Sequence, residues 1–129
     1  MTDESGFDRA RQIARVAWAF ERERTGHPSD SLAVVLAADT LVVTLHGALS
    51  AAERTLAGTE AGAALVREFH RALFASACGP LRQEVERITG TAVREASAEV
   101  QGATGTVVLV FLLAGGVPPE SWSGVPASA

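Results

Sequence analysis

The sequence predicts an α+β domain in which helices cover one face of a four-stranded antiparallel sheet. Three observations lead to this fold class. Residues 32–48 and 92–113 each contain two short apolar runs separated by turn residues, as in a β-hairpin. Residues 5–24 and 59–89 instead repeat their apolar residues at helical spacing. The order of elements is therefore helix, hairpin, short helix, long helix, hairpin, in one domain over residues 1–114, with a Pro/Gly/Ser-rich disordered tail at 115–129.

The first helix, at 5–24, has more apolar surface than one contact with a sheet would use. Beside its main apolar stripe, Phe7, Ala14 and Trp18 align at i, i+7 and i+11. Two interpretations stay open. This second line is the interface with a partner chain, or Trp122 or the loop near Pro28 covers it within the chain.

The charges around this helix are balanced, with five acidic and five basic residues in the first 25. A basic and aromatic grouping around Trp18 could bind an anion or a single-stranded base. We instead expect a solvated, ion-paired helix face, with Glu21 among its exposed carboxylates.

The first hairpin is predicted from 32–38 and 40–48, which turn at Asp39. Its first strand is apolar on both faces, so it lies inside the sheet or is covered by another subunit. Its second strand alternates one buried and one mixed face, and the mixed face includes Thr44 and His46.

Capping signals divide the central helical region. Ser50 and Glu53 form a capping box for a short helix that ends at Gly58, and Thr59 caps the next helix. The dipeptide at 79–80, Gly-Pro, predicts a kink, or a stop with a restart at the proline. Gly90 closes the helix in the left-handed conformation.

The second hairpin is predicted from 92–100 and 106–113, joined by the glycine-containing loop 101–105. The run VVLVFLL is the most β-prone part of the chain. We expect it to be a central strand, because an edge strand of this composition would template aggregation.

No catalytic or metal-binding spacing is present among His27, His46, His70 and Cys78. His70 has no second ligand three or four residues away, and we interpret it as a half-buried core histidine. We therefore expect no metal, no cofactor and no enzymatic activity. If a small molecule binds, we expect a pocket between the sheet and the long helix, lined by Thr44, His46 and Phe74.

Composition narrows the partners and the location. The net charge of −4 gives the surface no electrostatic reason to bind nucleic acid. The longest apolar run, 107–114, is far shorter than the roughly 20 residues of a membrane span, so no direct membrane insertion is expected. A single cysteine and a polar start without a secretory signal predict a cytoplasmic protein.

Several short motifs carry a resemblance to a known family over about residues 7–113. They are Gly26-His27-Pro28, Asp39-Thr40-Leu41-Val42-Val43, Gly47-Ala48-Leu49-Ser50 with Glu53, Gly62, Leu65-Val66, Arg71-Ala72-Leu73-Phe74, Pro80, Thr89-Gly90, and Thr104-Gly105-Thr106 with Val110-Phe111. In this order and spacing the chain resembles the small bacterial MpsC-like family, which takes its label from a sodium-translocating, membrane-potential-generating system.

The resemblance implies a soluble partner of membrane subunits related to cation and inorganic-carbon transport. Together with the apolar first helix, it favours a non-enzymatic accessory or adaptor domain that forms a homodimer. The alternative is a small-molecule sensing module that uses the pocket described above, and an unrecognised enzyme is the third hypothesis.

Overall fold

The computed structural model describes residues 2–26, 29–116 and 125–128, with side chains for 9–24, 26 and 29–116. The described elements are α1 (Thr2–Thr25), β1 (Ser31–Ala37), β2 (Thr40–His46), α2 (Ala51–Leu56), α3 (Glu60–Ala77), α4 (Gly79–Thr89), β3 (Val93–Gln101), β4 (Thr106–Leu113) and β5 (Val125–Ser128). The predicted fold class and element order are confirmed.

The strands form one antiparallel sheet in the order β3-β4-β2-β1-β5. The four predicted strands are present, and β4 is central as predicted, between β3 and β2. Val125–Ser128 differ from the expectation of a disordered tail, because they pair with β1 as a fifth strand. Pairing with β5 also places β1 inside the sheet. Residues 117–124 and 129 of the predicted tail lie outside the described residues.

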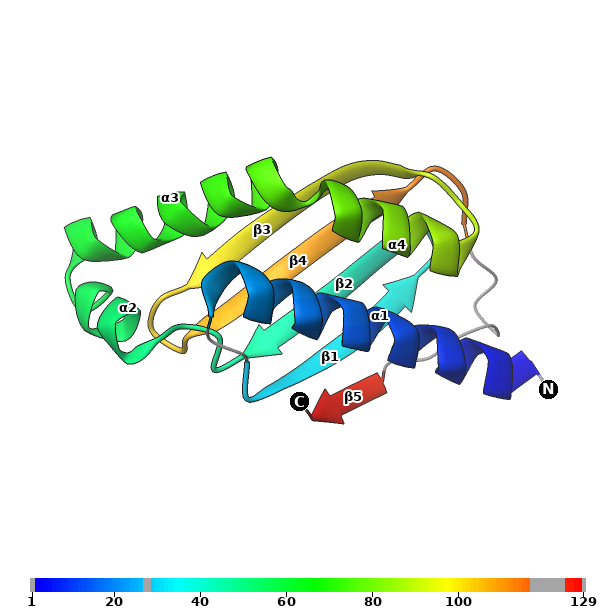
Figure 1. Cartoon of the computed structure of the whole chain (residues 1–129), viewed down its shortest axis with the longest axis horizontal. Helices are drawn as coiled ribbons and strands as arrows, with labels where there is room; N and C mark the ends of the chain where they lie inside the picture. Colours follow the sequence, from blue (N-terminus) through cyan, green and yellow to red (C-terminus); the bar gives the residue numbers. More distant parts are fainter. Residues whose placement is uncertain (1, 27–28, 117–124, 129) are drawn as a thin grey trace.

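The helices lie together on one face of the sheet, as Figure 1 shows. Helix α1 packs against β1 and α4, and α3 packs along β3. Between the two layers lies a core that includes Ile13, Leu41, Val85 and Phe111, each at most 1% exposed. The opposite face of the sheet has no helix over it among the described residues.

Local signals in the sequence place most helix ends. Glu53 N–H donates to Ser50 Oγ over 3.2 Å and Ser50 N–H donates to Glu53 Oε1 over 2.9 Å, which completes the predicted capping box. Thr59 Oγ1 accepts the N–H of Gly62 over 3.0 Å at the start of α3. Gly90 ends α4 with φ of 76°, as predicted.

The predicted break in the long helix is a stop and restart. Helix α3 ends at Ala77, Cys78 caps it, and α4 begins at Gly79 with Pro80 in its first turn. Proline has no N–H to donate to the preceding turn, so the α3 hydrogen-bond pattern cannot continue through it. The break lets α4 pack against α1 while α3 follows β3 (Figure 1).

Candidate functional site

The three residues predicted to line a ligand pocket do not meet. Thr44 and His46 alternate with the buried residues Val43 and Leu45 along β2, so their side chains lie on the sheet face that carries no helix. Phe74 lies on the opposite face, where its ring packs edge-on against Phe111 at 6.2 Å between centroids. The predicted pocket was therefore wrong, because the sheet separates its residues.

The three residues predicted to form an interface on α1 have different environments. Ala14 is 5% exposed and belongs to the core, so its apolar surface is used within the chain. Trp18 is half-buried against the core, with the Arg22 guanidinium 5.3 Å from its ring centroid. The side chain of Phe7 lies outside the described residues.

The structure instead assembles ionisable groups from three helices into one cluster, Glu21 of α1, Glu53 of α2 and His70 of α3. We call these residues the carboxylate–histidine cluster. Glu53 is its centre, because its two oxygens have different partners. Oε1 accepts the backbone N–H of Ser50 in the capping box, and Oε2 lies 2.6 Å from Nε2 of His70.

His70 is the buried member of this pair, at 4% exposure. Its ring lies edge-on to Phe69, with 5.3 Å between centroids. The sequence predicted a core histidine, and burial agrees with that prediction. The contact with Glu53, seventeen residues earlier, explains how an imidazole is accommodated there, since buried polar groups need hydrogen-bond partners.

The contacts of Glu53 also determine its protonation. Burial alone raises the pKa of this carboxyl group, but hydrogen bonds from the Ser50 backbone and from His70 lower the pKa below its usual value of 4.5. Glu53 therefore carries a negative charge at neutral pH.

Glu21 differs from the sequence prediction of an exposed carboxylate, because its side chain is only 4% exposed. Burial, with a further contribution from the nearby negative charge of Glu53, raises the pKa of Glu21 to about 7. One carboxyl group of the cluster is thus charged at neutral pH, whereas the other exchanges its proton in the physiological range.

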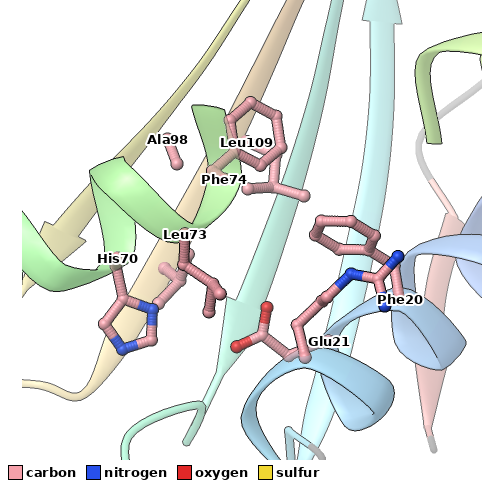
Figure 2. Close-up of a pocket in the computed structure, with 9 residues that line it drawn as sticks. Phe20, Glu21, His70, Leu73, Phe74, Ala98 and Leu109 are labelled. Carbon is pink, nitrogen blue, oxygen red and sulfur yellow. The ribbon is translucent and has the colours of Figure 1, made fainter. Parts of the chain in front are cut away.

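A narrow cleft opens onto the cluster between α1 and α3. Figure 2 shows Glu21 and Phe20 from α1 facing His70, Leu73 and Phe74 from α3 across it. Its free space is about 10 Å³, close to what a single water molecule requires. The cleft can therefore admit water and protons but has no room for an organic substrate in this conformation.

The cluster does not supply a metal site. Within the described part of the chain, no group of three or more His, Cys, Asp or Glu residues could hold a metal ion. The single cysteine, Cys78, is half-buried at the junction of α3 and α4. The chemistry that the cluster can perform is thus proton uptake and release.

Comparison with known proteins places this structure in a family. The model of the family described as "Na+-translocating membrane potential-generating system (MpsC)" matches residues 8–115, which include most of α1, the helices α2 to α4 and the strands β1 to β4. The chain belongs to the MpsC family.

One MpsC-like relative is the uncharacterized protein YbcI of Bacillus subtilis (strain 168). It is 26% identical to this chain over 102 residues, which cover 79% of this chain and 82% of YbcI. No solved structure matched the chain significantly. Among the described residues of this MpsC-family chain, no helix has both the length and the hydropathy that crossing a bilayer requires.

Sequence reasoning missed the carboxylate–histidine cluster, although one signal was available. Glu21 lies eight residues after Ile13 and four residues after Ala17, on the same apolar stripe of the helix. A carboxylate therefore occupies a helix position that faces the core. The Glu53 capping role was readable from local spacing. The contact between Glu53 and His70 was not readable from local spacing, because this contact depends on how α2 folds back against α3.

Proposed function

We propose that this MpsC-family chain is a non-enzymatic accessory domain that acts by binding other protein chains, as a homodimer, at a membrane ion or inorganic-carbon transport system. The observation that carries the proposal is a set of large apolar side chains at the surface of the helix layer. Leu65 and Phe69 of α3 are 63% and 53% exposed, and Leu56 of α2 is 48% exposed.

This exposure supports binding to another chain because the fold buries most of its other large apolar side chains in a core. Its core contains 23 buried apolar residues among those described, yet Leu65 and Phe69 lie one helical turn apart on the solvent side of α3. Contiguous exposed apolar surface of this kind marks protein or membrane contacts.

The family description supports the choice of system. It names a Na+-translocating membrane potential-generating system, and an accessory chain whose described helices do not cross a membrane would reach that system by docking onto its membrane subunits. We place this docking at the cytoplasmic side.

Membrane potential is the quantity that tests this proposal. Cells of the source organism lacking this chain are compared with cells complemented by the wild type, by Phe69→Asp, or by the exposed control Ala75→Asp of the same helix. Potential is followed with a voltage-sensitive dye at low and high external Na+. We expect a Na+-dependent loss of potential that the wild type and Ala75→Asp restore and Phe69→Asp does not. Equal potential with and without the chain would contradict the proposal.

A second candidate function, sensing, is favoured by one observation, the pKa of about 7 at Glu21. The cleft holds about one water molecule, so the ligand that fits it is a proton rather than an organic molecule. Carbon-13 NMR of the glutamate carboxyl groups tests this candidate. One resonance that titrates near neutral pH and disappears in Glu21→Gln supports it, and titration of all the glutamates near their usual value argues against it.

A further inference from the structure

We propose that two copies of this chain associate through an antiparallel pair of α3 helices, with the copies related by a twofold axis that passes between Glu68 and Phe69. This inference rests on the proposed self-association and assigns it to one surface. We call that surface the α3 stripe; it consists of Ala61, Leu65, Phe69, Ala72 and Ser76.

The α3 stripe follows from helical geometry. Its residues are spaced by four, four, three and four positions, so they fall on one line along the helix. All five are exposed. Leu65 is nine positions from Phe74, which is half a turn away at 100° per residue. Because Phe74 packs toward β4 through Phe111, Leu65 points away from the sheet.

The stripe is complementary to itself when a second copy runs antiparallel. Around a point midway between residues 68 and 69, Leu65 and Ala72 lie at equal distances on opposite sides, as do Ala61 and Ser76. Each Leu65 then faces the small Ala72 of the other copy, and the two Phe69 rings meet at the centre. Large side chains opposite small ones allow two helices to approach within roughly 8–10 Å.

The charges beside the stripe support the antiparallel direction. Glu68 and Arg71 lie on the same flank, and a twofold axis places this flank against its own copy. With a rise of about 1.5 Å per residue, Glu68 lies about 3 Å along the axis from Arg71 of the other copy. In a parallel pair the twofold axis would run along the helices and bring each flank against the opposite flank of the other copy, so Glu68 and Arg71 would not face each other and this attraction would be lost.

Arg71 is already positioned for such a contact. Its guanidinium binds Glu99 of β3 with 3.0 Å between Nη2 and Oε2, which holds the side chain at the surface beside the stripe. A second carboxylate from the other copy would complete a Glu99–Arg71–Glu68 network across the interface. Exposed pairs of this type contribute little affinity, so they set direction and register while the apolar residues supply the binding energy.

The strength of the association follows from its size. One pair of helices is smaller than a standard interface, which buries roughly 800 Å² per partner. We therefore expect a dimer that dissociates within the micromolar range, and not an obligate assembly.

Light scattering and sedimentation across the micromolar range test the proposal. We expect the wild-type mass to rise from the 13.4 kDa monomer toward twice that value, and the L65D/F69D variant to remain a monomer. The matched control is Val35→Asp, which alters an apolar residue 46% exposed on the open sheet face and should leave the dimer intact. Circular dichroism confirms folding of each variant.

Charge exchange and cross-linking test the direction. Glu68→Arg and Arg71→Glu should each weaken the dimer severalfold, and the double exchange should restore it. In a Cys78→Ala background, chains with Leu65→Cys should form disulfides with Ala72→Cys chains but not with one another. In the antiparallel pair the two residues 65 lie about 10 Å apart along the axis, beyond the reach of a disulfide.

The outcomes separate this inference from the function on which it rests. A dimer that survives L65D/F69D and is lost in Val35→Asp would overturn the α3 interface while leaving self-association in place. Cross-linking of Leu65→Cys chains with one another would overturn the antiparallel direction. A wild-type monomer at all concentrations would overturn the interface and the dimer, and the membrane-potential assay would still decide the accessory role.

Discussion

Glu21 places an ionisable group in a buried position beside Glu53, and its effect on stability depends on pH. The folded chain raises the pKa of this group from 4.5 to about 7, so between these values the folded state holds more protons than the unfolded state. The contribution of Glu21 to stability therefore falls as pH rises from about 4.5 to about 7 and is constant above that range.

The variant Glu21→Gln removes this penalty. At 1.36 kcal/mol per pKa unit, we expect the variant to gain up to about 3 kcal/mol of unfolding free energy relative to wild type between pH 5 and pH 8. Urea denaturation at a series of pH values measures the gain. Glu23→Gln, at a side chain 71% exposed, is the control and should follow the wild type. A Glu21→Gln curve parallel to the wild type would show that Glu21 titrates normally.

Glu53 acts in the opposite direction and at lower pH. Because hydrogen bonds lower its pKa, its stabilisation is present above pH 4.5 and is lost as pH falls through its folded-state value. The combined contribution of the two carboxyl groups to stability is therefore greatest between their titration ranges, on the acidic side of neutrality.

Replacing Glu53 should cost more than removing the cap alone. Ser50→Ala removes one side-chain cap, at a cost of about 1 kcal/mol. Glu53→Ala also removes the partner of the buried His70 ring, and we expect about 2–3 kcal/mol in urea denaturation at neutral pH. The same variant should lower the Glu21 pKa measured by NMR, because the Glu53 charge contributes to raising it. An equal loss of unfolding free energy in the two variants would mean that the contact between His70 and Glu53 does not stabilise the fold.

At the scale of elements, contacts that are local in sequence were predictable and contacts through space were not. The Ser50–Glu53 box, the Gly79-Pro80 break and the Gly90 terminus all depend on neighbours within a turn or two. Thr44 and Phe74 lie on opposite faces of the sheet because the helices cover the face of β2 that carries Val43 and Leu45. Alternation along β2 identifies two faces but does not identify which of them meets α3.

The junction of α2 and α3 shows why one glycine there has a structural role. A Cβ on Gly62 would collide with the backbone carbonyl of Leu56, whereas a Cβ on Gly79, at the start of α4, would meet nothing within 4 Å. The end of α2 thus approaches α3 more closely than any residue with a Cβ at position 62 would allow. This approach brings Glu53 within reach of His70.

The pair of variants Gly62→Ala and Gly79→Ala tests this account. We expect Gly62→Ala to destabilise the fold by roughly 1–3 kcal/mol, because backbone atoms must separate. Gly79→Ala should be neutral or stabilise by up to about 1 kcal/mol, since alanine restricts the unfolded chain. Thermal unfolding measures both. A Gly62→Ala protein as stable as wild type would mean that α2 can shift without cost.

At the scale of the whole molecule, the helix layer and the sheet each have an apolar surface that is exposed among the described residues. The α3 stripe faces outward from the helices, and the open sheet face includes Val35 together with the half-buried Val42, Val108 and Val110. The sequence predicted a first strand that is apolar on both faces and a long helix with apolar residues at helical spacing. It could not show which surfaces remain exposed after the chain has folded, because that depends on the arrangement of all the layers.

Self-association through the α3 stripe makes stability depend on protein concentration. A dimer that forms only from folded chains shifts the folding equilibrium by mass action, by about 0.7 kcal/mol per chain for each tenfold rise in concentration above the dissociation constant. In a domain of this size the shift corresponds to a rise of roughly 2–4 °C in the midpoint of thermal unfolding. The midpoint of L65D/F69D should be independent of concentration, and that of Val35→Asp should follow the wild type. A midpoint independent of concentration in all three proteins would mean that the folded chain is stable alone and that dimerisation adds nothing to its stability.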